Sequence, residues 1–261
     1  MAAIDYPKIS IVTVTFNCEK TIEETIQSIL SQNYPNLEYL IIDGKSTDST
    51  MSIVEKYSDR ISRIVSEKDN GISDAFNKGV RLSSGDIVGI INGDDVLLPG
   101  ALDALAKAYD PEVDVYRGNI MVWNDQTDNR IRVVPTMDIN LRKVVWNVCH
   151  QSTFVARKCY DRFGLFNESF KYMMDADLLH RFYLGGAKFK YVDYDMALFR
   201  LGGVTKSSFK KKIPELKAVI RANGGSGLLV AYRVVMFYCY HTAKSLVQKI
   251  LGGDRARKMR Y

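Results

Sequence analysis

Two adjacent carboxylates, Asp94 and Asp95, follow the apolar residues Ile90 and Ile91 in the segment IINGDDV. Neighbouring carboxylates at the end of a buried strand are costly unless they have a partner. A hard divalent cation is the expected partner, because carboxylate oxygens bind such ions and diphosphate oxygens of a substrate can complete the coordination. The pair equally fits the start of a helix near Leu97, since acids favour that position, and both interpretations stay open.

Three more acids lie in segments that suit chemistry. Asp43 ends the apolar run YLII and fits either a nucleobase or ribose contact or a turn, because Asp-Gly pairs are frequent in turns. Asp175 and Asp177 are two positions apart in MMDADLLH, so on a helix they diverge and would have different roles. A carboxylate at the mouth of a crevice could deprotonate an acceptor hydroxyl, whereas an acidic helix amino-terminus would give the same pattern.

The remaining polar candidates are weaker. His150, in HQS, is as compatible with a structural histidine as with a ligand, and Arg200 fits a partner for a carboxylate. The sequence has neither a Walker phosphate loop nor a dinucleotide glycine fingerprint, so a diphosphate would have to be held by metal and side chains. This pattern argues against a kinase or a dehydrogenase.

The elements that must position these residues alternate between strands and helices. Strands are predicted over residues 8–15, 37–42, 61–65 and 86–92, and helices over 19–32, around 53–57 and over 74–82. Thr21 and Glu24 fit a capping box at the first helix. The alternation predicts a doubly wound α/β sheet with parallel strands, whose ligand crevice lies beyond their carboxyl ends. A hairpin is predicted where residues 113–123 and 130–134 flank the turn-forming segment NDQTDN.

Taken in order, these segments resemble family 2 of the inverting glycosyltransferases, of the type found in bacterial polysaccharide biosynthesis. The resemblance covers nearly everything before Lys206, and the order of the segments is far more specific than any one motif. It implies the GT-A fold, a Rossmann-like doubly wound sheet with a smaller acceptor-binding half. The matching segments are Ser10–Asn17, Ile41–Thr50, Ser66–Gly79, Gly85–Asp95, His150–Phe154, Gly164–Arg181 and Phe199–Thr205.

The resemblance also implies roles for individual residues. Asp95, the better candidate for direct coordination, and Asp94 would hold Mn²⁺ or Mg²⁺, and Asp175 matches the position of the catalytic base. Met174 stands where many relatives carry Glu, and Ser73 stands where close relatives often carry Tyr, which leaves the sugar open. The residues implied to bind the nucleotide are Thr15, Asn17, Asp43, Asp69 and Asp94. Those implied to bind the acceptor or a phosphate are His150, Gln151, Asp177 and Arg200.

These assignments predict a metal-dependent enzyme that moves a sugar from a nucleotide-sugar, with UDP expected, and inverts the anomeric carbon. The expected acceptor is a glycan or a polyprenyl-diphosphate-linked molecule in cell-surface polysaccharide biosynthesis. A nucleotidyltransferase on a similar α/β fold is the main alternative, but the segment TFNCEK lacks the glycine-rich basic loop that such an enzyme usually shows. A catalytically inactive sugar-binding or membrane-binding scaffold is the other alternative, and the retained carboxylates argue against it.

The chain of 261 residues is expected to divide into a glycosyltransferase domain over 1–205 and a basic amphipathic extension over 206–261. Within the domain, residues 1–98 are expected to bind the nucleotide and 99–205 the acceptor. The extension holds 13 Lys and Arg against two acids, whereas the rest of the chain carries 23 against 28. A basic end on a mildly acidic body indicates an anionic partner, and we expect a membrane surface and no nucleic acid.

The segment from Leu228 to Tyr240 is apolar except for Arg233, and its 13 residues are too few for a bilayer span of about 20. It is expected to form a helix that lies on a membrane or, alternatively, packs on the domain or in a homodimer interface. No secretory signal is visible near the first residue, which favours a cytoplasmic protein, peripheral on the inner face of the cell membrane. The four cysteines lack metal-ligand spacing and are expected to be free thiols.

Overall fold

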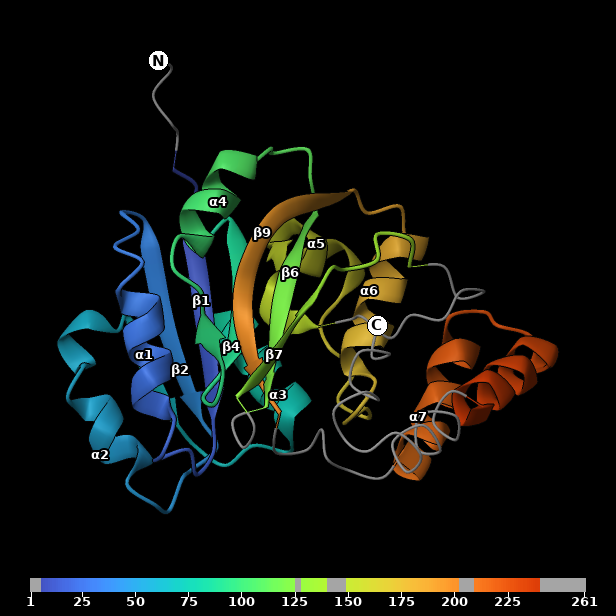
Figure 1. Ribbon diagram of the computed structural model, residues 1–261, viewed down its shortest axis with the longest axis horizontal. Coiled ribbons are helices and arrows are strands. Elements are labelled where there is room, and N and C mark those ends of the chain that lie inside the picture. Colours follow the sequence, from blue (N-terminus) through green and yellow to red (C-terminus); the bar gives the residue numbers. More distant parts are fainter. Residues whose placement is uncertain (1–5, 125–127, 140–148, 202–208, 240–261) are drawn as a thin grey trace.

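The computed structural model describes residues 6–124, 128–139, 149–201 and 209–239, drawn in colour in Figure 1. The strands are β1 (Ile9–Thr15), β2 (Leu37–Asp43), β3 (Arg63–Ser66), β4 (Ile87–Asn92), β5 (Val96–Leu97), β6 (Val115–Asn124), β7 (Asn129–Val133), β8 (Thr153–Ala156) and β9 (Phe189–Arg200). The helices are α1 (Ile22–Leu30), α2 (Thr50–Glu55), α3 (Ile72–Leu82), α4 (Ala101–Ala108), α5 (Arg157–Phe163), α6 (Met174–Leu184) and α7 (Phe209–Ala222), with short 3-10 turns η1 (Ser58–Arg60) and η2 (His150–Ser152).

Four parallel strands form the amino-terminal half of the sheet, in the order β3-β2-β1-β4. Helices α1, α2 and α3 lie in the crossovers between them, so all four carboxyl ends reach the same edge. The register pairs Thr15 with Asp43 and Val14 with Asn92. The predicted alternation of parallel strands and helices is confirmed for this half.

The second half of the sheet is mixed. Strand β8 runs antiparallel to both β4 and β6, β9 is parallel to β6, and β5 is antiparallel to β9. Strand β7 pairs antiparallel with β6, which confirms the predicted hairpin. The prediction of parallel strands is therefore confirmed only as far as β4, because the β6–β7 hairpin reverses the chain without a crossover helix.

Strand β9 connects this second half back to the carboxylate segment. It pairs with β6 along most of its length, with a register shift in the middle. Near its end, Leu198 pairs with Val96 of β5, which directly follows the carboxylates. The pairing places Arg200 beside Asp95, although 105 positions separate the two residues in the sequence.

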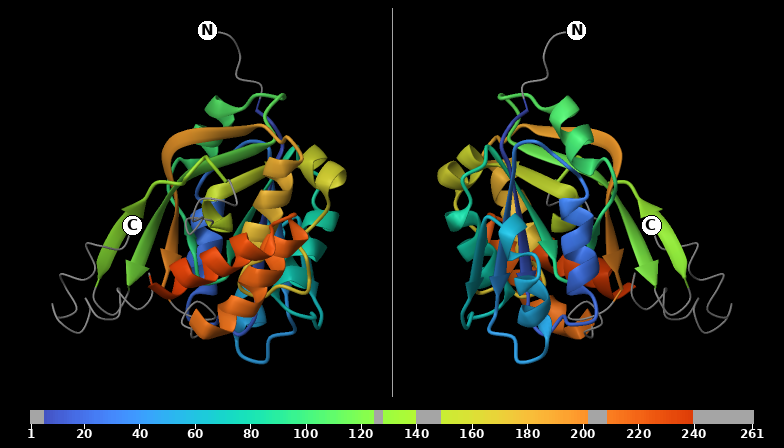
Figure 2. Two further views of the ribbon diagram at one scale, coloured as in Figure 1. Left: turned by 90° about the vertical axis from the view of Figure 1, so that its right-hand side faces the viewer. Right: turned by 90° about the vertical axis from the view of Figure 1, so that its left-hand side faces the viewer.

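Helices cover both faces of the sheet. Helices α1, α2 and α4 pack on one face, where Ile26 and Leu102 join strand residues such as Ile11 in one apolar cluster. Helices α3, α5 and α6 pack on the other face, around Phe76 and Phe182. Figures 1 and 2 show the sheet between these helices. Strands β1, β2 and β4 are mostly buried on both faces, and their sequences are accordingly rich in apolar and β-branched residues.

Helix α1 begins without the capping box that Thr21 and Glu24 predict, so this prediction was wrong. Among the described residues no side chain caps the helix, and the Thr21 hydroxyl donates instead to the carbonyl oxygen of Gly93 at 2.8 Å. Thr25, one turn later, donates to the carbonyl oxygen of Asp95 at 2.7 Å. The two hydroxyls hold α1 against the carboxylate segment, a long-range contact that the local pattern cannot reveal.

Helix α7 and a further helix over residues 227–239 lie beside α6 (Figure 1). Val219 of α7 joins the apolar cluster around α6 and is 1% exposed. Leu216 and Ile220 of α7 pack with Val230 and Phe237 of the second helix. The described part of the expected extension is therefore built onto the sheet domain.

No helix in the described part of the chain has the length and apolar composition needed to cross a membrane. The expected boundary between residues 205 and 206 lies outside the described residues. The same is true of Tyr240 and of the polar residues that follow it in the sequence: His241, Lys244, Lys249, Arg255, Arg257, Lys258 and Arg260. All four cysteines lie in the described part and are free thiols, as predicted.

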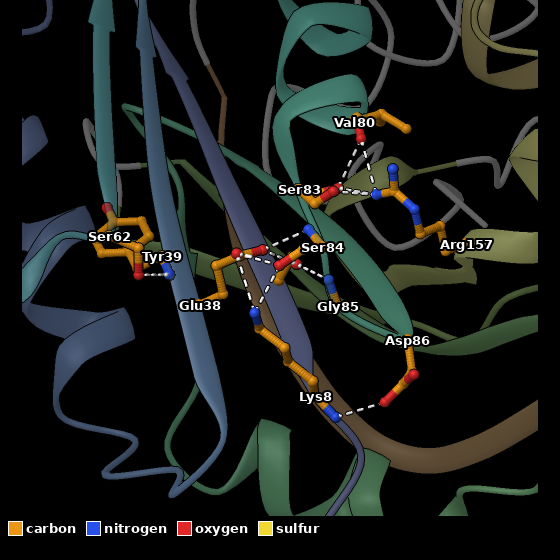
Figure 3. Close-up of polar contacts among 11 residues, drawn as sticks. Lys8, Glu38, Tyr39, Ser62, Val80, Ser83, Ser84, Gly85, Asp86 and Arg157 are labelled. Carbon is orange, nitrogen blue, oxygen red and sulfur yellow. Dashed lines mark hydrogen bonds and ion pairs between the residues drawn. The ribbon is translucent and has the colours of Figure 1, made fainter.

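A polar network closes the amino-terminal edge of the parallel strands (Figure 3). Glu38 accepts hydrogen bonds from Ser10 Oγ at 2.6 Å and from the N–H and hydroxyl of Ser84 at 2.7 and 2.5 Å. It also pairs with Lys8 Nζ at 3.3 Å, and the backbone N–H of Lys8 binds Asp86. Burial would raise the pKa of Glu38, but these donors outweigh it and lower the pKa to about 2.

Candidate active site

The carboxyl ends of β1, β2 and β4 meet at the edge of the sheet opposite the Glu38 network. Because these strands are parallel and paired in register, the loops after Thr15, Asp43 and Asn92 leave the sheet side by side. Ligands of open α/β sheets bind at this edge. The loops carry most of the residues that the sequence predicts to bind a nucleotide or a metal.

Asp95 is wholly buried, and both of its carboxylate oxygens already have donors. Oδ2 accepts hydrogen bonds from Gln151 Nε2 at 2.8 Å and Asn92 Nδ2 at 3.1 Å. Oδ1 accepts the backbone N–H of Arg200 at 3.1 Å. Burial, followed by the charge of Asp94, raises the pKa of Asp95. Asp95 thus ties η2 and β9 to the carboxylate segment, a geometry that suits direct metal coordination less than the sequence indicates.

Asp94 is the carboxylate of the pair with room for a ligand. Its side chain is partly exposed, and no other residue of the described chain forms a hydrogen bond with its carboxylate. Burial raises its pKa against the opposing charges of Arg200 and His150. A carboxylate of this kind fits a hard divalent cation. Nowhere in the described residues do three His, Cys, Asp or Glu side chains gather into a metal site, so substrate phosphates would have to supply further ligands.

His150 joins Asp175 to the end of β4. Its Nδ1 lies 2.9 Å from Asp175 Oδ2, and its Nε2 lies 3.2 Å from Asn92 Oδ1. Burial would lower the pKa of His150, but the nearby carboxylates, Asp175 first, outweigh it and raise the pKa. Both ring nitrogens are engaged by protein groups and only 12% of the side chain is exposed. The geometry therefore gives His150 an internal role in place of the predicted contact with acceptor or phosphate.

Asp175 lies in the first turn of α6, with 20% of its side chain exposed. Its second oxygen, Oδ1, is buried and has no hydrogen-bond partner among the described residues. Asp175 and His150 line a cavity whose other walls are mostly apolar and include Ile90, Tyr160 and Leu178. A carboxylate with so few competing donors is suited to accept a proton.

The amino-terminus of α6 is held in place from α7. Glu215 accepts the backbone N–H groups of three successive residues, Lys171 at 3.0 Å, Tyr172 at 2.7 Å and Met173 at 3.0 Å. These residues lead directly into the first turn of α6. The position of Asp175 therefore depends on a helix that the sequence assigned to a separate extension.

Asp177 points away from this cluster, which agrees with the predicted divergence of the two acids. Its carboxylate is 2% exposed, pairs with Arg181 Nε at 2.9 Å and accepts Asn223 Nδ2 at 3.4 Å. Arg181 in turn donates to the carbonyl oxygens of Phe163 and Leu165 at 2.7 and 2.6 Å. Asp177 joins α6 to the segment after α5 and to α7, so the structure does not bring it to the acceptor position that the sequence predicts.

Arg200 lies beside Asp94 at the end of β9. Its Nη2 pairs with Glu24 Oε2 at 2.6 Å, and its Nε donates to the backbone carbonyl of Asp94 at 3.2 Å. The guanidinium covers the Trp123 ring at 4.3 Å from the centroid, and Arg130 lies 5.1 Å from it. This fixed cation beside the open carboxylate suits a diphosphate. Sequence reasoning missed Trp123, because the hairpin pattern gives no sign of its distant cation.

Asp43 and Asn17 organise the loop after β2. Asp43 is fully buried; its Oδ1 accepts Ser46 Oγ at 2.5 Å, and its Oδ2 accepts Ser66 Oγ at 2.6 Å. Asn17 has a φ of 51°, and its Oδ1 accepts the N–H of Thr47 at 2.8 Å. Both side chains brace the loop from within, in addition to any contact with a nucleotide.

An exposed aromatic ring, Phe16, lies over the same loops and is 58% exposed. Phe16 and Asp69 approach Gly44 so closely that a Cβ there would come within 3.4 Å of Phe16 Cδ2 and 2.5 Å of Asp69 Oδ2. Asp69 Oδ1 also accepts the N–H of Gly71 at 3.0 Å. An exposed ring beside a fixed carboxylate offers a surface for a flat base. Sequence reasoning missed Phe16, although an aromatic residue inside the polar segment TFNCE is a visible signal.

Two other predicted residues are packed inside the protein. Thr15 is 5% exposed, and its Oγ1 lies so near Gly93 that a Cβ at Gly93 would come within 2.7 Å of it. Gln151 is 3% exposed and donates to Asp95. Gln151 thus holds the carboxylate segment by a hydrogen bond, Thr15 packs against it at Gly93, and both residues have little surface left for a ligand.

The two positions at which the chain departs from the usual residues of the resembled family contact each other. Ser73 is 2% exposed, and its hydroxyl donates to the carbonyl oxygen of Phe170 at 2.7 Å. Its Oγ also lies 3.0 Å from Met174 Sδ. The residue that would precede the base and its neighbour on α3 therefore form one packing unit.

Comparison with known proteins identifies the family of the chain. The family model described as Glycosyl transferase family 2 matches residues 10–163. An uncharacterized glycosyltransferase of Rickettsia prowazekii is 28% identical over 190 residues, which cover 68% of this chain and 59% of that protein. The chondroitin synthase of Escherichia coli is 29% identical over 179 residues, which cover 66% of this chain and 26% of that protein. The chain thus spans less than two thirds of the length of either relative.

Solved structures share the fold. The TarS protein of S. aureus, residues 1–349 in complex with UDP-GlcNAc, has a TM-score of 0.66 and 20% identity, covering 81% of this chain and 65% of that chain. A mannosyltransferase from Pyrobaculum calidifontis in complex with GDP-Man and Mn²⁺ has a TM-score of 0.61 and 17% identity, covering 98% and 79%. The GT-A fold expected from the sequence is thereby confirmed. Since the family model also matches more than half of its length, the chain belongs to glycosyl transferase family 2.

Proposed function

We propose that the chain is a metal-dependent inverting glycosyltransferase that transfers a sugar from a UDP-sugar to an acceptor hydroxyl. One observation carries the proposal: a hydrogen-bonded chain runs from Asp95 through Asn92 and His150 to Asp175, and it sets a carboxylate base near the open Asp94. The S. aureus TarS complex with UDP-GlcNAc supports a UDP-sugar donor, and the P. calidifontis complex with GDP-Man and Mn²⁺ supports the use of a metal.

The donor would lie across the loops after β1, β2 and β4. Phe16 offers its exposed ring to the base, and Asp69 beside it offers a carboxylate oxygen to the base or ribose, while the buried Asp43 supports the loop from beneath. Arg200, held against Trp123, would bind the diphosphate. Asp94 would hold Mn²⁺ or Mg²⁺, which when bound neutralises the charge that develops on the departing diphosphate.

Asp175 would act as the general base. It would accept the proton of the acceptor hydroxyl while the hydroxyl oxygen attacks the anomeric carbon from the side opposite the nucleotide. Such an in-line displacement inverts the configuration and needs no covalent intermediate on the protein. The scarcity of donors around Asp175, whose Oδ1 has no described partner, supports this role.

A panel of nucleotide-sugars tests the donor. The purified chain should slowly release UDP from a UDP-sugar in the presence of Mn²⁺ or Mg²⁺, and excess chelator should stop the release. Release of inorganic pyrophosphate would point to nucleotidyl transfer instead. Tight binding of GDP or CMP by calorimetry, without binding of UDP, would overturn the donor assignment.

We also propose a glycan or polyprenyl-diphosphate-linked acceptor in cell-surface polysaccharide biosynthesis. Similarity to the chondroitin synthase of Escherichia coli supports a polysaccharide product. A lipid-linked acceptor would be met at a membrane, and the carboxyl-terminal helices have a surface suited to one.

The helix over residues 227–239 has apolar residues on two faces. Val230 and Phe237 are buried against α7, whereas Leu228, Tyr232 and Val235 are 85%, 52% and 58% exposed. The spacing of these three exposed residues puts them on one side of the helix. An exposed apolar stripe of this kind suits an interfacial helix, whose apolar side chains enter the boundary between the lipid headgroups and the acyl chains.

Positive charges accompany this stripe. Helix α7, packed against the same helix, exposes Lys211, Lys217 and Arg221. Each cation near an anionic membrane surface is worth on the order of 1 kcal/mol. We therefore propose that the carboxyl-terminal helices hold the protein on the anionic inner face of a membrane.

Liposome sedimentation tests this surface. The full chain should sediment with anionic vesicles at low salt, and replacement of Leu228, Tyr232 and Val235 by Ser should release it while UDP binding persists. Val134→Ser is the matched control, because Val134 is also an exposed apolar residue, at 50%, but it follows β7 and does not belong to the carboxyl-terminal helices. If the wild-type chain ignores such vesicles and the triple variant converts a dimer to a monomer, the stripe is a homodimer interface and the membrane proposal fails.

A further inference from the structure

His150 is the link between the proposed base and the strand end that carries the open carboxylate. We propose that His150 is a positioning residue: it holds Asp175 by a hydrogen bond from Nδ1 and anchors itself to Asn92 by a hydrogen bond from Nε2. The base and the donor site are thereby fixed relative to each other through one ring. This inference rests on the proposed function, in which Asp175 accepts the proton of the acceptor.

The direction of each hydrogen bond follows from the groups that surround the ring. Asn92 Nδ2 donates to Asp95 Oδ2 at 3.1 Å, so the Asn92 amide oxygen is the atom that faces His150. Because a carbonyl oxygen accepts only, His150 Nε2 must donate to it. An ionised Asp175 also accepts only, so Nδ1 must donate as well. The ring therefore serves as a double donor between two fixed acceptors.

The anchoring groups are themselves fixed. Asp95 receives Gln151 Nε2 at 2.8 Å and the N–H of Arg200 at 3.1 Å, so it is fixed in place. An Asn92 amide that turned over would put its oxygen against the Asp95 oxygen that its NH₂ group now binds. Phe76 packs edge-on against the imidazole at 4.8 Å between ring centres. His150 consequently has one orientation available, and Asp175 Oδ2 is the group that this orientation serves.

The arrangement also explains why the Asp175 carboxylate is suited to one direction of approach by the acceptor hydroxyl. With Oδ2 held by His150 and the carboxylate rooted in the first turn of α6, rotation of the carboxylate would break the 2.9 Å bond. A base held within a narrow range of angles removes part of the ordering cost of the transition state. Loss of the hydrogen bond should therefore lower kcat more than it changes donor binding.

Two substitutions separate the two bonds of the ring. In His150→Asn the amide nitrogen lies near the position of Nδ1 and can still donate to Asp175, whereas in His150→Gln it reaches the position of Nε2 and can donate only to Asn92. We expect His150→Gln to lower kcat by about tenfold or more with little change in donor KM, and His150→Asn to lose clearly less. Equal losses of kcat in the two variants, or a loss confined to donor KM, would overturn the positioning role.

A measurement independent of turnover keeps this inference separate from the proposed function. The chain has three histidines, so selective ¹⁵N labelling of histidine gives few imidazole signals to assign. His150 Nδ1 should carry a proton in the wild-type chain, and Asp175→Asn should shift that signal while leaving the His180 signal unchanged. An unprotonated Nδ1 would overturn the pairing. If the pairing is seen but no nucleotide-sugar is turned over, the pairing stands and the proposed function fails.

Discussion

The two edges of the parallel sheet treat their carboxylates in opposite ways. At the amino-terminal edge, Glu38 is bound by Ser10, Ser84 and Lys8, and its pKa is lowered to about 2 (Figure 3). At the carboxyl-terminal edge, burial raises the pKa of both Asp94 and Asp95. The same strands, β1, β2 and β4, supply or adjoin both groups.

Burial by itself does not explain the difference. The Glu38 side chain is 14% exposed and Asp95 is wholly buried, so both carboxylates have lost most of their water. Glu38 has gained the ammonium group of Lys8 and three hydrogen bonds of 2.5–2.7 Å. Asp95 has hydrogen bonds of 2.8–3.1 Å and lies beside the like charge of Asp94, and Asp94 has gained no donor from another described residue. Ionisation of Glu38 therefore stabilises the fold, while ionisation of Asp94 costs stability. Groups that are costly in this way gather at functional sites.

The largest effect is expected for Asp94→Asn, which tests the contrast between the two edges directly. We expect loss of turnover to background, because the neutral amide can neither bind a divalent cation well nor offset the charge of Arg200. The raised pKa means that ionised Asp94 is less favourable in the folded than in the unfolded chain, so the thermal unfolding temperature at pH 7–8 should stay equal or rise. Any gain should vanish below about pH 4, where the carboxyl is protonated in both states.

Turnover and thermal unfolding measured on the same Asp94→Asn preparation check this prediction. Asp95→Asn is the matched variant, since Asp95 has donors on both oxygens and its replacement disturbs Gln151 and Arg200. A fall of several degrees in Asp94→Asn would show that Asp94 is a structural group, and the contrast between the edges would then fail.

The next largest effect is expected at Asp175. Asp175→Asn keeps the size of the side chain but cannot take up the acceptor proton, so kcat should fall by about a hundredfold or more while UDP binding persists. Asp177→Asn is the control on the same helix. Its partners are Arg181 and Asn223, so it should lower the unfolding temperature and change kcat less. If Asp177→Asn were the more damaging to kcat, the two roles would have to be exchanged.

The sequence predicted the half of the fold in which local pattern and long-range structure agree. Strands β1 to β4 are rich in apolar and β-branched residues, and such strands separated by helices run parallel with their carboxyl ends at one edge. That edge is where Asp43 and Asp94 were expected, and the structure places them there. The resemblance to the family added the candidate base on α6, which lies close to the same edge through His150.

What the sequence could not predict depends on partners far along the chain. Asp95 was expected to be the better metal ligand, but its two oxygens are bonded to Gln151 and Arg200, which lie 56 and 105 positions away. Glu215 holds the loop before Asp175 from a helix assigned to a separate extension. Hydrogen bonds of this kind leave no periodic trace, because a single polar residue makes them.

A smaller effect is expected at Arg200, the side-chain cation beside Asp94 at the carboxyl-terminal edge of the sheet. Arg200→Lys should raise the donor KM by about tenfold and change kcat less, because one ammonium group cannot pair with Glu24, reach the Asp94 carbonyl and lie flat on Trp123 together. Arg130→Lys is the control, since Arg130 lies 5.1 Å from the centre of the same ring but is 53% exposed. If initial-rate kinetics showed equal changes in both variants, the effect would come from the lost contact with the Trp123 ring and not from lost binding of the diphosphate.

The smallest effect on activity is expected at the other edge, in Glu38→Gln. The amide oxygen can still accept from Ser10 and from the Ser84 N–H, but the new NH₂ group faces the ammonium of Lys8. Loss of these charge-assisted bonds should cost about 1 kcal/mol, or about 2–4 °C in the unfolding temperature of a chain of this size. Turnover should be unchanged, because the network lies at the opposite edge from the proposed site.

The loss of stability in Glu38→Gln should depend on pH. The pKa of Glu38 is 4.5 in the absence of interactions and about 2 in the folded chain, so its ionised form contributes stability that is complete above pH 4.5 and is lost as the pH falls toward 2. The difference in unfolding temperature between wild type and Glu38→Gln should therefore be largest at neutral pH and shrink below pH 4.5. Asp94→Asn should show the reverse, a difference of zero or opposite sign at neutral pH. A Glu38→Gln deficit that is independent of pH would mean that shape, and not charge, holds this edge together.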